Sequence, residues 1–208
     1  MNRSRRAFVF ATAATTLAAA TPLLAAPEED QEKLAIAYFN ARGLHKFLLL
    51  NKRRGQILAV ENGEVILRKN AISGKVAGDE IDTLAPVTPA GFFSLAFSRD
   101  QDGPNASMSF NVRRDGSVDV VHPVINVPGQ SRMRRLTRGT AADKKISSGC
   151  VNLAPDDYRL MAQFARSARQ TMTSVDGSRQ ISGSFFVVLP DRATATRQIL
   201  HIPDDFRP

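Results

Sequence analysis

Short apolar runs separated by turn signals recur along this 208-residue chain, and this pattern restricts it to a β-rich fold. The strongest turn signal is Asn62-Gly63, because a two-residue hairpin turn needs positive φ at both positions, which Asn and Gly tolerate. It separates apolar runs at residues 56–60 and 64–68, and another run spans residues 47–50. We therefore predict a meander of three antiparallel strands in this part of the chain.

The rest of the chain is predicted to contain further strands and one or two short helices. Strands are expected at residues 91–95, 108–112, 118–121 and 185–189. Apolar residues at helical spacing predict helices at residues 28–42 and 156–169. Residues 73–91, residues 129–145 and the tail from Asp191 show little regular pattern. The predicted fold class is therefore mostly β, a β-rich α+β domain.

The N-terminus has the pattern of a cleavable export signal. A basic segment precedes an uncharged, Ala-rich apolar stretch, so residues 1–26 are assigned to the signal, with cleavage near Ala25 or Ala26. Residues 4–9, Ser-Arg-Arg-Ala-Phe-Val, resemble a twin-arginine signal and predict a periplasmic protein. The alternative is an uncleaved anchor helix. The weak hydrophobicity of the stretch and the acidic residues after it favour cleavage, and hence no stable membrane insertion.

The rest of the chain suits one folded domain, because 43% of the residues are hydrophobic and the length allows a single sizeable core. We expect a helical lead-in at residues 27–45 and the main domain at residues 46–208. The formal net charge of +8 suits an anionic partner such as nucleic acid, anionic lipid or the carboxylate-rich cell wall. The export signal argues against nucleic acid, and so does the lack of aromatic residues among the basic ones. The sequence carries no signal for an oligomeric state.

Cys150 is the only cysteine, and an unpaired thiol in an oxidising compartment calls for a function. A thiol nucleophile needs a nearby base and hydrogen-bond donors for the oxyanion. Gly149 permits a tight turn, and the small Ser147 and Ser148 leave the approach to the thiol open. Backbone N–H groups around Gly149 are candidates for the oxyanion donors. The alternative is a buried, inert cysteine.

Three histidines are candidates for the base, namely His45, His122 and His201. His122 closes a strand of alternating pattern and precedes Pro123. A strand end is a rigid place from which to present a side chain, so His122 has the most suitable position. A purely structural role is the alternative for each of the three.

The basic segment at residues 129–145 contains Arg132, Arg134, Arg135 and Arg138. Guanidinium groups favour a thiolate electrostatically and bind carboxylates in a bidentate manner, whereas the alternative is a solvated run of charges. One cysteine and three scattered histidines give no zinc-binding spacing. A Gly-rich phosphate loop and a Gly-x-Ser-x-Gly turn are both missing from the sequence. No metal or organic cofactor is therefore expected.

Several segments resemble motifs of the L,D-transpeptidase family, in the same order along the chain. Residues 147–152, Ser-Ser-Gly-Cys-Val-Asn, resemble its signature Ser-His-Gly-Cys-(Ile/Val)-Arg. Residues 88–93, Thr-Pro-Ala-Gly-Phe-Phe, resemble its Thr-Pro-x-Gly-x-Phe segment, and residues 72–74 resemble its Val-Ser-x-Gly region. His122 stands where the family carries its catalytic histidine. The resemblance covers residues 47–153.

Two positions depart from the signature, since Ser148 replaces its His and Asn152 replaces its Arg. Some branches of the family have a similar Gly-Cys-Ile-Asn form. His122 is followed by Pro123 and Val124 instead of the common Gly-Thr. The stretch from His122 to Cys150 is long and predicts an enlarged basic loop over the cleft.

The resemblance implies a β-sandwich catalytic domain and a peptidoglycan substrate. Cys150 would attack a tetrapeptide stem to form a thioester, which an amine acceptor resolves. His122 would act as the base, and backbone N–H groups near Ser148 to Cys150, Gly149 included, would bind the oxyanion. The substrate-binding residues expected from these segments are Ser147, Asn152, Arg132, Arg134 and Arg135.

Two alternatives stay open beside the transpeptidase. An L,D-carboxypeptidase or related cell-wall hydrolase would use the same thiol with water as acceptor. A catalytically silent cell-wall-binding module would keep the fold alone. The changes at Ser148 and Asn152 favour the silent module, whereas the retention of both Cys150 and His122 opposes it.

Overall fold

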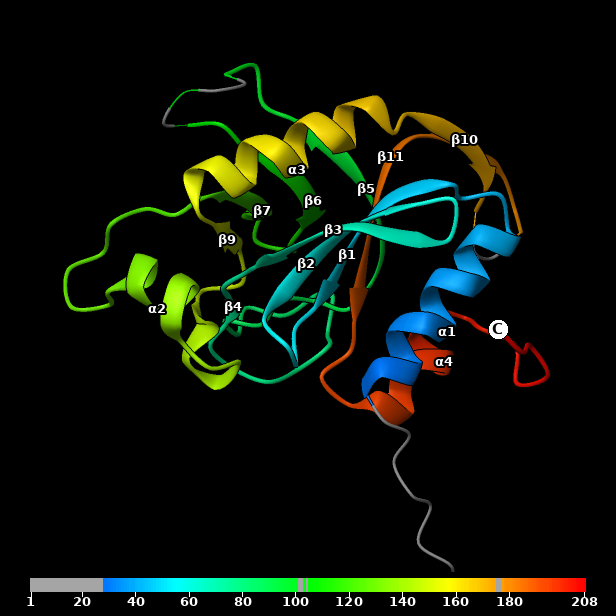
Figure 1. Ribbon diagram of the computed structural model, residues 1–208, viewed down its shortest axis with the longest axis horizontal. Helices are drawn as coiled ribbons and strands as arrows, with labels where there is room; N and C mark the ends of the chain where they lie inside the picture. Colours follow the sequence, from blue (N-terminus) through cyan, green and yellow to red (C-terminus); the bar gives the residue numbers. More distant parts are fainter. Residues whose placement is uncertain (1–27, 101–102, 104, 175–176) are drawn as a thin grey trace, which may run out of the picture.

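The computed structural model describes residues 28–100, 103, 105–174 and 177–208 (Figure 1). The predicted export signal at residues 1–26 lies outside these described residues. Within the described part, no helix combines the length and the apolar character needed to cross a membrane.

The predicted three-stranded meander is confirmed. It consists of β1 (Lys46–Asn51), β2 (Gln56–Glu61) and β3 (Glu64–Asn70), paired antiparallel in sequence order. Asn62 and Gly63 have φ of 51° and 83° between β2 and β3. Both values are positive, as the predicted hairpin turn requires.

The other strands extend this meander into a larger sheet. They are β4 (Ser73–Gly74), β5 (Gly91–Phe97), β6 (Met108–Val112), β7 (Val118–Pro123), β8 (Lys145–Ser147), β9 (Val151–Leu153), β10 (Gln170–Thr173) and β11 (Gln180–Leu189). The described residues form a nine-stranded sheet in the order β3-β2-β1-β11-β5-β6-β7-β9, with β10 paired to β11. A separate parallel pair joins β4 to β8.

The last long strand, β11, occupies the middle of the sheet. It runs parallel to β1 and antiparallel to β5, although it lies far from both in the sequence. Its apolar residues face two different cores, since Phe186 belongs to one and Phe185 to the other. β1 behaves in the same way, with Leu48 and Leu49 on opposite faces. Burial on both faces explains why the central part of β1 and the second half of β11 are continuous apolar runs.

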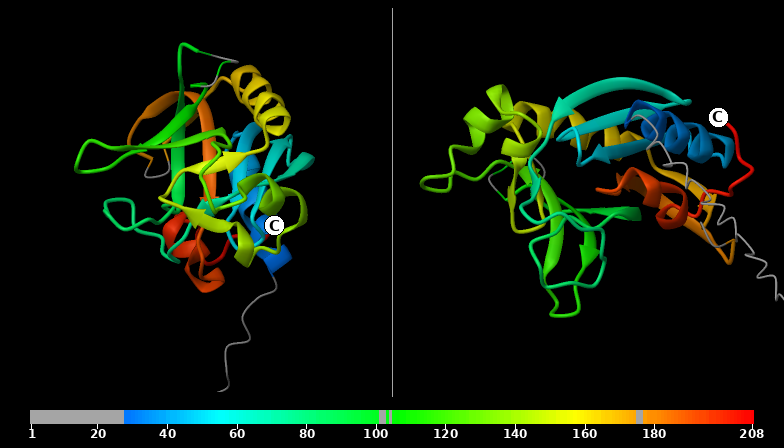
Figure 2. Two further views of the ribbon diagram at one scale, coloured as in Figure 1. Left: turned by 90° about the vertical axis from the view of Figure 1, so that its left-hand side faces the viewer. Right: turned by 90° about the horizontal axis from the view of Figure 1, so that it is seen from below.

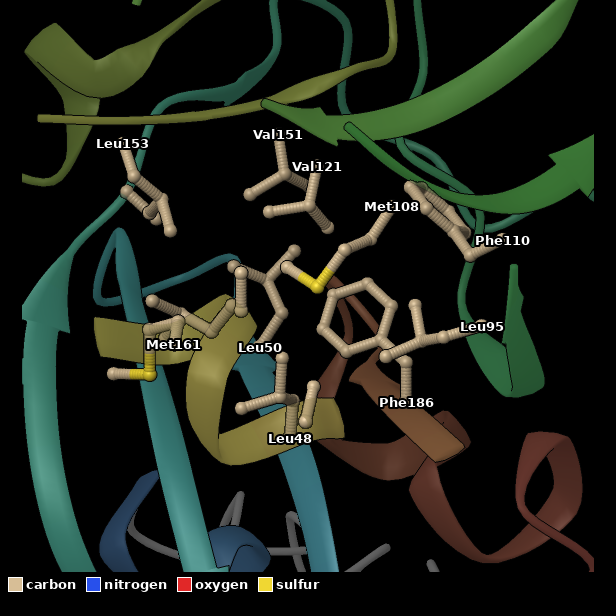
Figure 3. Close-up of a cluster of buried hydrophobic side chains, with 14 of the residues drawn as sticks. Leu48, Leu50, Leu95, Met108, Phe110, Val121, Val151, Leu153, Met161 and Phe186 are labelled. Atoms are coloured by element: carbon tan, nitrogen blue, oxygen red, sulfur yellow. The ribbon is translucent and has the colours of Figure 1, made fainter. Parts of the chain in front are cut away.

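The first core lies between the two halves of the strongly bent sheet. Figure 3 shows Val121 of β7 and Val151 of β9 pointing toward Leu48 and Leu50 of β1. Met161 of α3 (Pro155–Ser167) closes this core from the side. The β-rich class and its sandwich-like arrangement are therefore confirmed. Because β7 and β9 are anchored in this core, the residues at their ends have a rigid support.

Two helices coincide with the predicted ones. These are α1 (Glu28–Ala41), which packs on the second core, and α3. The structure adds two short helices in segments predicted to be irregular, α2 (Arg132–Arg138) and α4 (Thr196–Ile199), and the 3₁₀ turns η1 (Ala142–Lys144) and η2 (Ala193–Ala195). Figure 2 shows α2 at the β9 end of the molecule, away from α1 and α4.

Candidate active site

Two adjacent parallel strands bring the predicted nucleophile and base together. β7 ends with His122 and Pro123, and β9 begins directly after Cys150. The strands pair in parallel, with His122 opposite Asn152 in the register. Residues about thirty positions apart in the sequence are therefore neighbours at one edge of the sheet.

The serine and glycine before Cys150 shape a tight turn. Ser147 is buried, and its hydroxyl donates to the Cys150 carbonyl at 2.6 Å. The same hydroxyl oxygen accepts a hydrogen bond of 3.1 Å from the Gly149 N–H. Ser148, in contrast, is exposed. Ser147, expected at the substrate, instead contacts the backbone of the turn that presents the thiol.

Gly149 is required at its position by both conformation and space. Its φ of 135° belongs to the region that side chains disfavour. A Cβ added there would lie 2.6 Å from Asp119 Oδ1 and 2.9 Å from the Val87 carbonyl oxygen, and it would also collide with the Arg113 guanidinium. The close packing beneath the turn therefore depends on the missing side chain.

A buried ion pair, which the sequence interpretation missed, supports the turn from below. Arg113 and Asp119 meet at 2.7 Å. The Arg113 guanidinium also donates to the carbonyls of Ala85, Val87 and Ser148, at 2.9, 3.0 and 3.2 Å. Arg113 directly follows β6 and Asp119 lies near the start of β7, and this short connection between two predicted strands was the available signal that they lie close together. One guanidinium thus joins the 83–88 loop to the segment that carries the thiol.

The three segments that carried the family resemblance meet at Thr88. The buried Thr88 hydroxyl donates to the Gly149 carbonyl at 2.6 Å and accepts from the Gly74 N–H at 2.8 Å. Its carbonyl accepts a hydrogen bond of 2.8 Å from the buried Lys52 ammonium group. The segments at residues 72–74 and 88–93 therefore hold the turn at Gly149 in place.

His122 makes one hydrogen bond through each ring nitrogen. Nδ1 lies 2.7 Å from the Pro123 carbonyl oxygen, and Nε2 lies 3.2 Å from Asn152 Nδ2. Asn152 was expected to contact substrate, but its side chain is completely buried. Its Oδ1 accepts a hydrogen bond of 2.5 Å from Arg132 Nη1. Asn152 therefore contacts the predicted base and not the solvent.

The other two histidines lie elsewhere. The exposed His45 ring contacts Asn40 at the end of α1. His201 lies in the C-terminal tail, where its carbonyl accepts a hydrogen bond from Tyr38 of α1. Among the three histidines, His122 is therefore the one placed beside the turn of Cys150.

The electrostatics favour a neutral thiol and a neutral imidazole at rest. Burial raises the pKa of the Cys150 thiol, and the charge of Asp119 adds to that rise. A hydrogen bond from the Val120 backbone and the charges of Arg113 and Arg132 oppose it. Burial likewise lowers the pKa of His122. The hydrogen bond to the Pro123 carbonyl opposes this change, and the charge of Arg132 supports it. A neutral imidazole can accept a proton, and a neutral thiol needs a base before it can react as a thiolate.

The three arginines expected at the substrate have different surroundings. Arg132 donates to Gln130 Oε1 at 2.6 Å as well as to Asn152. Arg135 donates to the Gln130 carbonyl at 2.8 Å and to the Asp143 carbonyl at 3.0 Å, so it stabilises the loop. Arg134 is exposed on α2.

Two pockets lie on either side of the segment that follows His122. One, of about 350 Å³, is lined by Val124, Ile125, Asn126, Ser131, Arg132, Met133, Arg134 and Pro155. The other, of about 360 Å³, is lined by Gly103, Ala106, Pro123, Val124, Ile125, Pro155, Tyr158 and Arg159. Arg132 connects the first pocket to the candidate site, and Pro123 connects the second. Among the described residues, no group of three or more His, Cys, Asp or Glu side chains is placed to hold a metal ion.

No family model matches the chain, and no curated protein sequence matches it. Among solved structures, the chain resembles L,D-transpeptidases. One from Xylanimonas cellulosilytica has 18% identity over 69% of this chain and 59% of that chain, with a TM-score of 0.36. One from Mycobacterium smegmatis has 15% identity over 69% and 58%, also with a TM-score of 0.36.

A third match is the helical cell shape determining protein Pgp2 from Campylobacter jejuni. It has 14% identity over 76% of this chain and 56% of that chain, with a TM-score of 0.41. This chain spans about three-fifths of the length of the three solved chains it matches. Its activity, substrate and partners are therefore proposals drawn from its own residues.

Proposed function

We propose that this protein is an exported cysteine acyltransferase of the L,D-transpeptidase type, with Cys150 as nucleophile and His122 as base. The observation that supports the proposal most directly is the pairing of β7 with β9, which sets His122 beside the turn of Cys150. The buried Arg113–Asp119 pair and the Thr88 hydroxyl hold that turn from below. The packing of Gly149 against the pair needs a residue without a side chain.

The first step is proton transfer from the thiol. The Pro123 carbonyl can only accept, so Nδ1 of His122 carries the proton and Nε2 is the basic nitrogen. When the substrate binds, Nε2 exchanges its contact with the Asn152 N–H for the thiol of Cys150 and takes the thiol proton as sulfur attacks the acyl carbonyl. The charges of Arg113 and Arg132 both lower the pKa of Cys150 and stabilise the developing thiolate, whereas the charge of Asp119 opposes them.

The second part of the acylation is collapse of the tetrahedral intermediate. The Gly149 N–H points toward Ser147 Oγ, so we assign the oxyanion to the backbone N–H groups of Cys150 and Ser148. The carbon–nitrogen bond to the terminal D-alanine then breaks, and the imidazolium of His122 gives its proton to the leaving amine. A thioester on Cys150 and free D-alanine are the products of this step.

An amine from a second stem peptide then attacks the thioester, and His122 accepts its proton while Cys150 leaves as the thiol. The result is a peptide cross-link, and water in place of the amine gives a carboxypeptidase. The exposed Arg134 and the pocket beside α2 are suited to a substrate carboxylate with an aliphatic body. Peptidoglycan stems have this chemistry, and the predicted export signal would place the protein beside them in the periplasm.

The test is intact mass spectrometry of the purified protein after incubation with a carbapenem, an acylating mimic of the donor. We expect one covalent adduct on the wild type and none on Cys150→Ala. An adduct strongly slowed in His122→Ala, but not in His45→Ala, would support the assigned base. A folded wild-type protein without an adduct would contradict the enzyme and favour the silent cell-wall-binding module.

The acceptor needs a second assay. Turnover of purified tetrapeptide muropeptides distinguishes cross-linked dimers from tripeptide monomers. Dimers would identify a transpeptidase, and tripeptides alone would identify a carboxypeptidase. Cys150→Ala should form neither product, because both products are proposed to arise from the same Cys150 thioester.

A further inference from the structure

The amide of Asn152 connects α2 to the proposed base. Its Nδ2 lies 3.2 Å from His122 Nε2, and its Oδ1 lies 2.5 Å from Arg132 Nη1. The Arg132 guanidinium is itself held by Gln130, whose Oε1 lies 2.6 Å from Nε. The Asn152 side chain is completely buried, so water does not compete for either contact.

The partners at each end determine the orientation of this amide. A guanidinium only donates hydrogen bonds, so the atom of Asn152 that faces Arg132 is the amide oxygen. The amide nitrogen therefore faces His122 and donates to Nε2. The Pro123 carbonyl at Nδ1 requires the same tautomer, with the proton on Nδ1 and a lone pair on Nε2. Both contacts of the ring thus agree on one protonation state.

This arrangement disfavours the imidazolium form of His122. A protonated Nε2 would face the N–H group of Asn152, and two donors repel. Rotation of the amide would remove that conflict, but it would turn the amide nitrogen toward the Arg132 guanidinium. The positive charge of Arg132 disfavours a second positive charge on the ring as well. An imidazolium formed during acylation therefore returns its proton readily to the leaving amine.

The charged and titratable groups around His122 come from three elements. Arg132 faces it from α2, and Cys150 lies in the turn before β9. Asp119, earlier on β7, is paired with Arg113 beneath that turn. Of these groups, Arg132 is the cation that is linked to the His122 ring by one intervening side chain, that of Asn152.

We propose that Arg132 is a positioning residue, which acts through Asn152 to hold the resting His122 as the neutral Nδ1–H tautomer with Nε2 unprotonated. The inference rests on the proposed function for the role of His122, and it makes the α2 segment part of the same machinery. The family signature has an arginine at position 152 of this chain. Here the guanidinium belongs to Arg132 of α2, and Asn152 lies between it and the proposed base.

The test is an NMR titration of the His122 imidazole in untagged protein labelled with ¹⁵N at histidine. His122→Gln assigns the signals among the three histidines. We expect nitrogen shifts of the Nδ1–H tautomer in the wild type. Asn152→Asp places a carboxylate against Nε2, which should raise the pKa of His122 by about 1–3 units and move the proton to Nε2.

Removal of the guanidinium should act in the same direction. Arg132→Gln should raise the pKa of His122 by a smaller amount, because it removes a charge and lets the amide rotate. Arg132→Lys keeps the charge, so it should leave the pKa of His122 closer to the wild-type value. Arg169→Gln, which removes an exposed charge after α3, is the matched control and should leave the pKa and tautomer unchanged. The half-exposed side chain of Arg132 makes its variants compatible with folding even if Asn152→Asp proves unstable.

The outcomes separate this inference from the proposed function. An unmoved pKa and tautomer of His122 in folded Arg132→Gln would overturn the positioning role. The carbapenem adduct reports independently on Cys150. An adduct on the wild type together with an unmoved His122 would therefore overturn the positioning role alone, and a shifted His122 without any adduct would overturn the function alone.

Discussion

The Thr88 hydroxyl donates a hydrogen bond of 2.6 Å to the Gly149 carbonyl, between residues 61 positions apart in the sequence. The same oxygen accepts the Gly74 N–H at 2.8 Å. Thr88 is buried, so neither bond competes with water. The position of the turn before Cys150 therefore depends on a loop that lies far from it in the sequence.

Thr88→Val should weaken both the fold and the acylation of Cys150. Valine has nearly the same shape, but it leaves a buried carbonyl and a buried N–H without partners, at a cost of about 1–3 kcal/mol for each group. A displaced turn should also slow carbapenem acylation by about 10- to 100-fold. Urea unfolding and adduct formation over time measure the two effects. Thr88→Ser, which keeps the hydroxyl, should retain most of both, and wild-type rates in Thr88→Val would contradict the role of this bond.

Gly149→Ala should abolish acylation. The methyl group would meet Asp119 Oδ1, the Val87 carbonyl and the Arg113 guanidinium, and the φ of 135° is unsuited to alanine. The turn must therefore move away from the ion pair. Adduct formation with a carbapenem measures the effect, and Gly116→Ala is a matched control, because Gly116 also has positive φ but nothing within 4 Å of an added Cβ. A normal acylation rate in Gly149→Ala would show that the turn tolerates displacement.

Asp119→Asn should destabilise the protein by about 3–5 kcal/mol, because it leaves the buried Arg113 guanidinium without its counter-charge. Thermal unfolding should show a melting temperature lowered by about 6–20 °C. The double variant Arg113→Met/Asp119→Leu should lose less stability than the single variants Arg113→Met and Asp119→Leu combined, since it removes both charges. Additive losses in this cycle would mean that the pair does not act as a unit.

The pH dependence should reflect two opposite pKa shifts. Burial lowers the pKa of His122, so its imidazole stays neutral as pH falls through about 6.5, the ordinary value. Acylation by a carbapenem should therefore persist below that pH and decline only as the ring becomes protonated. Burial raises the pKa of Cys150, so its alkylation by iodoacetamide without substrate should increase only above the ordinary range of a free thiol. Fast alkylation at neutral pH would instead show a preformed thiolate.

Much of the local structure could be predicted because it depends on neighbouring residues. Asn62-Gly63 predicted its hairpin through the φ that both residues tolerate, and apolar periodicity predicted α1 and α3. The short helix α2 and the 3₁₀ turn η1 were missed in the basic segment, and the short strand β8 was missed at its end. α2 has one buried residue, Leu136, so its periodicity was too weak to recognise.

The candidate site was predictable in part. Cys150 stood out as the only cysteine, and His122 as a strand end. The structure places them in adjacent segments, although their catalytic roles remain predictions. The roles expected of Ser147 and Asn152 changed, because both side chains are buried and contact the protein's own groups. Burial of a polar side chain depends on the whole fold, and its type alone does not indicate it.

The sequence by itself determined the β-rich class, the first hairpin, the two longer helices and the identity of the candidate nucleophile. Each of these depends on residue type or on spacing within about fifteen positions. The tertiary structure decided that β11 lies between β1 and β5, that β7 pairs with β9, and that Arg132 reaches His122 through Asn152. Such contacts join distant segments, and they become definite only when the two cores pack and fix the strand order.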